Sequence, residues 1–274
     1  MHDAAALSNR CLKLKIGYIV SFASLKGGVG KTLISANTAA LLTMLGSRVA
    51  LVDADLGSSS ATRSLHPEAT TYLNDILSAE GYTRFSGKAR YDGIPSRWLS
   101  KCTCRVRFSK RTAGSLDMLA SKPGLAQADP TLLIDVLLEL ADMGDYNYII
   151  VDSPPGPNFI TPAVLAASDL TAIVTTPGEA AASSASRIAT HLSYIGRKAG
   201  LVVNHTRLNE EKGGKLPEDV AFTVEVPFDA MAAEHMRRGE AYILLARGSR
   251  FSMAIIRLAE KIVECNKQIK AKNL

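Results

Sequence analysis

Glycine, lysine and threonine residues follow one another in a short stretch near the N-terminus, Lys26-Gly27-Gly28-Val29-Gly30-Lys31-Thr32. Glycine adopts backbone angles that other residues avoid, so the three glycines allow successive N–H groups to point at one anion. Beside such N–H groups, a lysine ammonium can bind phosphate oxygens and a threonine hydroxyl can bind Mg²⁺. The stretch therefore predicts a phosphate-binding loop, in which Lys31 holds the β- and γ-phosphates of a nucleotide and Thr32 holds the metal.

The chain on either side of this loop has the patterns of the two elements that must position it. An apolar run over residues 17–23 predicts a buried strand, and apolar residues at helical spacing predict a helix over residues 31–45. The N-terminus of that helix would add its partial positive charge to the anion site. The general loop pattern has glycine where this chain has Leu25. The alternative is an ordinary glycine turn before a helix, but Gly-Lys-Thr at a strand-to-helix junction favours phosphate binding.

Acidic residues follow two other apolar runs. Asp53-Ala54-Asp55 comes directly after one run, and Asp152 ends the other. In an open α/β sheet, ligands bind at the carboxyl ends of the strands, so we expect these carboxylates near the phosphate-binding loop. There, Asp55 and Asp152 would serve a magnesium ion and position a nucleophile. Two acids in a solvated turn are the alternative for Asp53 and Asp55.

These segments together resemble the deviant phosphate loop and the acidic motifs of the MinD/ParA family of P-loop ATPases. That family has a lysine at the position of Lys26 and does not require glycine at the position of Leu25. The resemblance covers about residues 17–263 and implies Mg²⁺-dependent hydrolysis of ATP to ADP and phosphate. It also implies an ATP-dependent homodimer, in which Lys26 reaches the partner's phosphates and supplies the charge of an arginine finger in trans.

The same resemblance implies roles for further residues. Asp55 would orient the attacking water, Asp152 would support the metal through water, and the loop of residues 153–156 would be the switch II that senses the γ-phosphate. Asn204 would read the adenine edge, because an amide offers a donor and an acceptor, although it could simply form a turn. Pro227 would pack on the base. The expected metal-binding residues are Thr32, Asp55 and Asp152, and the expected catalytic residues are Lys26, Lys31 and Asp55. The expected nucleotide-binding residues are Lys26, Gly27, Gly28, Val29, Gly30, Lys31, Thr32, Leu33, Asn204 and Pro227.

Strand and helix patterns alternate along the whole chain of 274 residues. The expected strands span 17–23, 49–52, 104–108, 116–120, 148–152, 170–175, 201–204 and 222–226, and the expected helices span 31–45, 71–79, 131–143, 179–197, 231–238 and 252–263. This alternation predicts an α/β fold with a doubly wound, mostly parallel sheet and helices on both faces. The resemblance implies that this is the P-loop NTPase fold. We expect an N-terminal tail over 1–16, one ATPase domain over 17–264, and a short basic C-terminal tail over 265–274, a frayed end of the last helix.

A basic segment is inserted between two of these core elements. Residues 84–111 contain nine basic residues and one acid, an excess larger than the formal charge of +6 of the whole chain. The basic residues are Arg84, Lys88, Arg90, Arg97, Lys101, Arg105, Arg107, Lys110 and Arg111. One interpretation is a solvated surface excursion, and the other is a phosphate-contacting patch that binds DNA nonspecifically. The alternation over 104–108 predicts an edge strand with Arg105 and Arg107 on one face.

Cysteine usage and hydropathy limit the class of protein. The four cysteines, Cys11, Cys102, Cys104 and Cys265, are too few and too scattered for a disulfide scaffold, and no histidine lies at zinc spacing. No apolar run approaches the length of a membrane span, so we expect a cytoplasmic protein. The basic C-terminal tail carries too few apolar residues for an amphipathic membrane-binding helix.

The resemblance leaves three functional hypotheses open. The basic segment favours an ATPase that partitions DNA or positions an intracellular cargo, with an activating partner protein. A membrane-associated, MinD-like regulator of division-site placement is the first alternative. An iron–sulfur carrier-type P-loop ATPase is the second, with Cys102 and Cys104 as the only pair that could supply cluster ligands.

Overall fold

The computed structural model describes residues 17–78, 94–124, 128–206 and 215–272. One eight-stranded sheet runs in the order β3-β4-β2-β5-β1-β6-β7-β8. All neighbouring strands are parallel except β3 and β4, which are antiparallel. The strands are β1 (Tyr18–Ala23), β2 (Arg48–Asp53), β3 (Cys104–Val106), β4 (Ser115–Leu119), β5 (Tyr148–Asp152), β6 (Leu170–Thr175), β7 (Lys198–Thr206) and β8 (Thr223–Pro227). The predicted mostly parallel sheet is confirmed.

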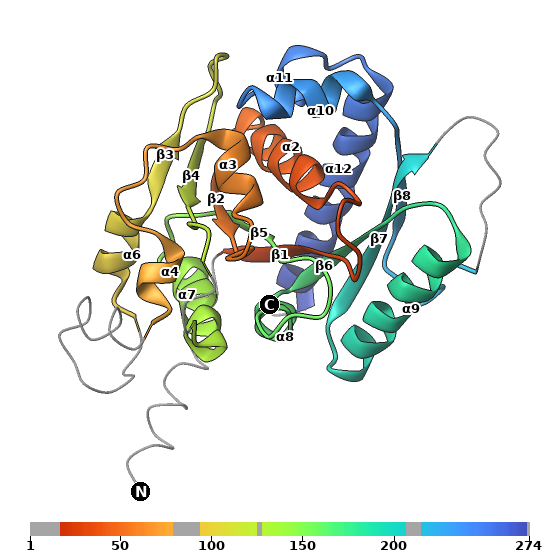
Figure 1. The fold of residues 1–274 in the computed structure, drawn as a ribbon, viewed down its shortest axis with the longest axis horizontal. Coiled ribbons are helices and arrows are strands. Elements are labelled where there is room, and N and C mark those ends of the chain that lie inside the picture. The colour runs from red at the N-terminus through yellow and green to blue at the C-terminus, as the bar shows by residue number, and fades with distance from the viewer. Residues whose placement is uncertain (1–16, 79–93, 125–127, 207–214, 273–274) are drawn as a thin grey trace, which may run out of the picture.

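Helices cover both faces of this sheet (Figure 1). One face carries α2, α10, α11 and α12, and the other carries α7, α8 and α9. The helices are α2 (Lys31–Met44), α3 (Ser60–Leu65), α4 (Leu73–Ile76), α6 (Ser96–Cys102), α7 (Pro130–Asp142), α8 (Thr161–Ala167), α9 (Glu179–Tyr194), α10 (Ala230–Arg237), α11 (Tyr242–Leu245) and α12 (Arg250–Lys272).

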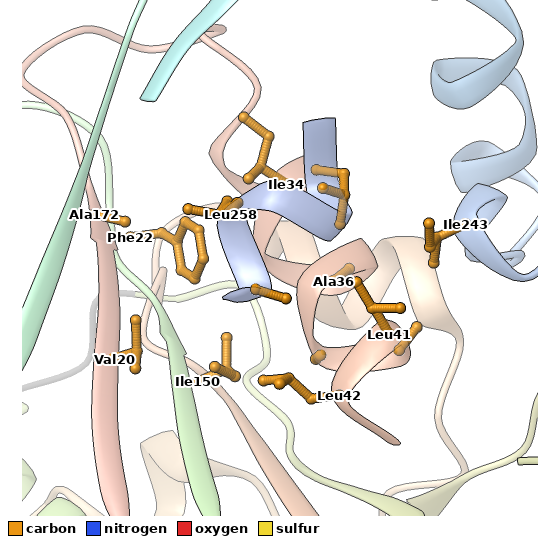
Figure 2. Packing of buried hydrophobic residues seen from close by; sticks show 14 of the residues in the cluster. Val20, Phe22, Ile34, Ala36, Leu41, Leu42, Ile150, Ala172, Ile243 and Leu258 are labelled. Carbon is orange, nitrogen blue, oxygen red and sulfur yellow. The ribbon is translucent and has the colours of Figure 1, made fainter. Parts of the chain in front are cut away.

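The central strands are buried on both faces, as is typical of a parallel sheet covered by helices. Every residue of β1 is buried, and its side chains alternate between the two faces. Val20 and Phe22 belong to the cluster under α2 and α12, whereas Ile19 packs with residues of α7 and α8. Figure 2 shows Phe22 beside Leu258 of α12, with residues of α2 packed around the same cluster. This packing fixes the end of β1 and the start of α2, which flank the glycine-rich loop.

The helix predicted over residues 71–79 is shorter than expected. It spans only Leu73–Ile76 and begins with a capping box, in which the Asp75 carboxylate accepts a hydrogen bond of 3.1 Å from the Tyr72 N–H. The short helices α3, α6, α8 and α11 were not expected from the sequence, because an element of one or two turns shows too little periodicity. The edge strand predicted over residues 104–108 is confirmed, although β3 ends at Val106.

The last helix is longer than expected, since it continues to Lys272 instead of ending near residue 263. Cys265 is buried, and Ile269 packs against the cluster that contains Phe22. The apolar side chains at this end of α12 are therefore part of the protein's own core. No helix in the described parts of the chain combines the length and the apolar character needed to cross a bilayer. The expected N-terminal tail and residues 84–93 of the basic segment lie outside the described residues.

Candidate active site

The loop between β1 and α2 has the backbone geometry of an anion cradle. Gly28 and Gly30 have φ angles of 75° and 91°, in the left-handed region that favours glycine. Gly27 does not lie in this region, so only two of the three glycines use such angles here. Because α2 begins at Lys31, the first N–H groups of the helix open directly onto the loop.

Asn204, at the end of β7, supports this loop. Its Nδ2 donates a hydrogen bond of 2.7 Å to the Val29 carbonyl, and its side chain is buried. A Cβ atom on Gly30 would lie 2.2 Å from the same Nδ2, so the close approach requires glycine at position 30. In this structure the Asn204 amide therefore contacts the loop backbone, and its contact with adenine stays a prediction.

The Lys31 ammonium is buried at the base of the loop. Its Nζ donates a hydrogen bond of 3.0 Å to the hydroxyl of Ser24, the residue that directly follows β1. Burial lowers the pKa of Lys31, although the carboxylates of Asp152 and Asp55 act in the opposite direction. The Ser24 hydroxyl is neutral, so this hydrogen bond does not compensate the charge of the buried ammonium, which an anionic ligand would do.

Thr32 and Asp152 meet where the first turn of α2 reaches the end of β5. Thr32 Oγ1 donates a hydrogen bond of 2.6 Å to Asp152 Oδ2, while Asp152 Oδ1 is buried without a hydrogen-bond partner among the described residues. Burial, and then the Asp53 carboxylate, raise the pKa of Asp152 to about 7. Mg²⁺ at a nucleotide site takes one or two protein oxygens together with phosphate oxygens and waters. The free carboxylate oxygen beside a threonine hydroxyl fits such an ion.

The side chain of Asp53 is bonded to groups of the protein itself. It is fully buried, and its Oδ2 accepts hydrogen bonds from the Thr62 N–H at 2.8 Å and the Thr62 hydroxyl at 2.7 Å. Thr62 Oγ1 in turn accepts a hydrogen bond of 2.9 Å from the Ser121 N–H. Burial raises the pKa of Asp53 to about 6, and the bonds from Thr62 oppose that rise. Asp53 thus holds α3 against the ends of β2 and β4.

Asp55 lies two residues further, in the turn that leads into α3. Its carboxylate accepts hydrogen bonds from the Ser58 N–H, at 3.2 Å, and from the hydroxyls of Ser58 and Ser60. The side chain is close enough to Lys31 to influence its pKa. The structure therefore brings Asp55, Asp152 and Lys31 to one edge of the sheet, as the strand-end argument predicted.

The segment predicted to be switch II is connected to the glycine-rich loop through the backbone. The Gly156 N–H donates to the Ser24 carbonyl at 3.0 Å, and the Ser153 N–H donates to the Phe22 carbonyl at 3.2 Å. Gly156 has a φ of 73°, so the chain turns there. A displacement of this segment would consequently change the position of Ser24, whose hydroxyl accepts the hydrogen bond from Lys31.

The region predicted to contact the base lies beside the loop and contains an aromatic pair. Pro227 ends β8, and the Phe228 N–H donates to the Thr206 carbonyl at 3.1 Å. The rings of His205 and Phe228 make an edge-to-face contact with centroids 5.7 Å apart. A Cβ atom on Gly30 would lie 3.8 Å from His205 Nε2, so this pair borders the glycine-rich loop.

The three remaining loop residues differ in environment. Lys26 is exposed, as a group that reaches another molecule must be. Leu25 is partly buried and packs against the cluster under α9, which gives a physical reason for an apolar residue at this position. Leu33 packs against the cluster under α2, so its side chain is used by the core.

The described part of the basic segment, residues 94–111, contains both paired and free charges. Arg105 on β3 forms an ion pair with Asp117 on β4, and Lys101 lies over the Trp98 ring at 5.6 Å from its centroid. Arg107, Lys110 and Arg111 are exposed and form no ion pair with any described residue. They lie in the loop that joins β3 to β4, at the edge of the sheet (Figure 1). The free positive charge is thus concentrated at the tip of this hairpin.

The cysteines of the same segment do not form a metal site. Cys102 is buried, and burial raises the pKa of its thiol. Cys104 is half-buried, and its thiol contacts the Met118 carbonyl at 3.3 Å. Within the described ranges, no three histidine, cysteine or acidic side chains gather in a way that could hold a metal ion.

Sequence reasoning missed Ser24, Thr62 and Ser60 as parts of the site. Each is a small hydroxyl residue that bonds to Lys31, Asp53 or Asp55. Serine and threonine are common in turns, so their types carried no signal. The run Ser58-Ser59-Ser60, which begins three residues after Asp55, was the only local hint.

Comparisons with known proteins agree with this geometry. A family model described as an AAA domain matches residues 17–204. An uncharacterized ATP-binding protein of Methanocaldococcus jannaschii is 28% identical over 252 residues, which cover 89% of this chain and 87% of that protein. The chloroplastic Fe-S cluster assembly factor HCF101 of Oryza sativa is 31% identical over 165 residues, which cover 60% of this chain but only 27% of that protein.

Two solved structures share the fold at low sequence identity. The septum site-determining protein MinD complexed with Mg-ADP, from Pyrococcus horikoshii, has a TM-score of 0.72 and 22% identity, and the match covers 90% of this chain and 96% of that one. A ParA family ATPase from Chlorobium tepidum has a TM-score of 0.69 and 22% identity, covering 90% and 98%. At this identity the likeness shows the fold alone, whereas the AAA-domain match extends over more than half of the chain. The chain therefore belongs to this AAA-domain family, and it shares the fold of MinD and of a ParA family ATPase.

Proposed function

We propose that this protein is a Mg²⁺-dependent ATPase that acts as a switch through ATP-driven homodimerisation. The observation that carries the proposal is the meeting of Thr32 with Asp152 beside the buried Lys31 and a glycine cradle. Each of these groups supplies one requirement of phosphoryl transfer, namely a metal ligand, a cation for the phosphates and N–H donors. The P-loop ATPase family supports ATP as the nucleotide.

The proposed mechanism assigns one task to each group. Lys31 and the N–H groups from Gly28 to Thr32 bind the β- and γ-phosphates and stabilise the charge that develops on them. Thr32 and Asp152 would hold Mg²⁺, which neutralises charge on the phosphate oxygens when it is bound. Asp55 accepts a hydrogen bond from the attacking water, whose oxygen bonds to the γ-phosphorus as the bond to the bridging oxygen breaks.

Dimerisation is proposed to complete this site. Lys26 is exposed on the loop and would place its ammonium on the partner's phosphates. Hydrolysis would then be slow in the monomer and faster in the dimer. The same proposal includes an activating partner protein and a cytoplasmic location. Microscopy of a tagged chain can test the location.

We propose DNA as the surface on which the dimer acts, in partitioning DNA or positioning another cargo. The exposed charges at the tip of the β3–β4 hairpin support this choice, because phosphate contacts are made by exposed lysine and arginine side chains. The fold of a ParA family ATPase is compatible with it.

Two alternatives have specific observations in their favour. The MinD fold favours a membrane-associated regulator of division-site placement, but the apolar side chains at the end of α12 lie against the core. The relative HCF101 favours an iron–sulfur carrier, but Cys102 is buried and its thiol pKa is raised.

The test is the ATPase rate with and without DNA, and with and without anionic liposomes, at about 100 mM salt, where charges more than about 10 Å apart are screened. Stimulation by DNA alone is the expected result. Stimulation by liposomes alone would move the protein to the membrane-associated alternative. A coloured preparation that absorbs in the visible range would revive the iron–sulfur alternative, and no ATPase activity under any condition would overturn the enzyme proposal.

A further inference from the structure

The carboxylate of Asp55 is enclosed by its own turn. The side chain is 6% exposed. Its Oδ1 accepts a hydrogen bond of 3.2 Å from the Ser58 N–H, and its Oδ2 accepts one from the Ser58 hydroxyl and one of 3.1 Å from the Ser60 hydroxyl. The two hydroxyl oxygens are themselves 2.7 Å apart. Both carboxylate oxygens are therefore engaged within five residues of chain.

This environment contrasts with that of Asp152, which has a buried oxygen without a hydrogen-bond partner among the described residues. A group that orients water for attack must accept a hydrogen bond from that water. An ionised carboxylate has a limited set of lone-pair directions, and here hydroxyl groups of the turn occupy those of Oδ2. Oδ2 of Asp55 thus has to give up at least one of these bonds before it can bind water, whereas Oδ1 carries only its bond from the Ser58 N–H.

The turn that supplies the hydroxyls carries backbone strain. Ser59, between the two bonding serines, has a φ of 50°, in the left-handed region that side chains rarely adopt. Its own hydroxyl is buried and finds no partner in the described parts of the chain. The helix that follows, α3, has only six residues. The bonds to the Asp55 carboxylate oppose the rearrangement of this strained turn, together with the hydrogen bond of 2.7 Å from the Ser59 N–H to the Asp55 carbonyl.

We infer that Ser58 and Ser60 form a hydroxyl clamp on Oδ2 of Asp55 that limits hydrolysis, and that the turn must open for Oδ2 to orient water. The inference rests on the proposed role of Asp55 and adds the regulation of that residue. The serines act through Asp55 and are positioning residues. In the closed turn, nucleotide can bind to the glycine-rich loop while the water-orienting carboxylate is occupied.

The experiment is single-turnover hydrolysis of ATP by the full chain, in which Ser58→Ala and Ser60→Ala remove the clamp together. Because these hydrogen bonds to a charged group stabilise the closed turn, their loss should favour the open turn, and we expect the hydrolysis rate to rise roughly 3- to 30-fold. The affinity for ATP should not change. Ser64→Ala is the matched control, because Ser64 lies on the same helix and its hydroxyl bonds to no described residue.

A purely structural role of the serines makes different predictions. Loss of structure would lower both the melting temperature and the ATP affinity without raising the rate. If the double variant fails to fold, Ser60→Ala alone is measured, because alanine is well accepted in the first turn of a helix. Ser60→Thr keeps a hydroxyl and should bring the rate back toward that of the original chain.

Asp55→Asn separates this inference from the proposed function. The inference predicts that Asp55→Asn abolishes hydrolysis both in the original chain and in the double serine variant. If Asp55→Asn keeps its activity, the proposed role of Asp55 is wrong and the clamp is wrong with it. If Asp55→Asn is inactive but the serine variants hydrolyse ATP at the original rate or more slowly, the clamp alone is overturned and the proposed function stands.

Discussion

The hydroxyl of Thr32 and the carboxylate of Asp152 are joined by a hydrogen bond of 2.6 Å across 120 residues of sequence. The contact exists because β5 is the neighbour of β1 in the sheet, so the end of β5 lies beside the loop that follows β1. It places a buried carboxylate against the first turn of α2. In the absence of metal and nucleotide, that carboxylate has an unusual environment with consequences for stability.

The first prediction concerns the pH dependence of stability of the protein free of metal and nucleotide. Burial raises the pKa of Asp152 to about 7 and that of Asp53 to about 6, whereas an unfolded aspartate has a pKa of about 3.9. Between about pH 4 and 7 the folded state binds more protons than the unfolded chain, so the free energy of unfolding falls as pH rises through this window. The melting temperature should therefore decrease from pH 5 to pH 7 by this contribution and level off above about pH 7.

Asp152→Asn removes the carboxylate whose pKa is raised more, of the two named above. We expect the variant to melt at a higher temperature than the original chain at about pH 8 and to show a flatter pH dependence. Asp145→Asn is the matched control, because Asp145 is exposed. Scanning calorimetry measures both effects, and an Asp152→Asn variant with the original slope would contradict the prediction.

The second prediction separates two glycines of the phosphate-binding loop. Gly30→Ala would place a Cβ 2.2 Å from Asn204 Nδ2 at a φ of 91°, so it should destabilise the protein by about 1–2 kcal/mol or more and abolish nucleotide binding. Gly27→Ala would meet only Pro155 Cβ at 3.8 Å, so the variant should keep the original melting temperature. Thermal melts and binding of a fluorescent ATP analogue measure the pair. Equal melting temperatures for the two variants would show that the contact with Asn204 does not constrain the loop.

The third prediction concerns the exposed lysine of the loop. Lys26→Ala should bind ATP with little change in affinity but lose ATP-dependent dimerisation, and with it most of the turnover, because its ammonium is proposed to act on the partner's phosphates. Light scattering with and without ATP measures the dimer, and Lys267→Ala, an exposed lysine of α12, is the control. A Lys26→Ala variant that dimerises normally would exclude the role in trans.

The fourth prediction uses the difference between free and paired arginines in the β3–β4 hairpin. Replacing Arg107, Lys110 and Arg111 by alanine together should weaken DNA binding and reduce the slope of log affinity against log salt by roughly 2 to 3, since each phosphate contact contributes about 0.9. Arg105→Ala is the control within the same segment, because Arg105 is paired with Asp117. It should change the slope by less than about 1.

The hairpin prediction has a clear contrary outcome. Affinity for DNA that is the same in the triple variant and the original chain, measured over a salt series, would mean that another surface binds DNA. Affinity that barely depends on salt would argue against phosphate contacts altogether.

The strands, the longer helices and the phosphate-binding loop could all be predicted from the sequence. Buried strands of a parallel sheet are continuous apolar runs, and α2 begins where the glycines end, so both are local patterns along the chain. The glycine, lysine and threonine types also determined the chemistry of the loop. Because strand ends carry ligand sites in such sheets, the positions of Asp55 and Asp152 near the loop followed without knowledge of the strand order.

The contacts that each of these side chains makes became known only from the folded structure. No local sequence pattern indicates which strands are neighbours in the sheet. The hydrogen bonds of Thr32 with Asp152, of Asn204 with Val29 and of Lys31 with Ser24 were therefore not predictable. The pairing of Arg105 with Asp117 and the continuation of α12 to Lys272 likewise depend on surfaces brought together by folding. Asp53 and Asp55 differ by two positions in sequence, yet one lies against Thr62 and the other against Ser58 and Ser60, because the chain turns between them.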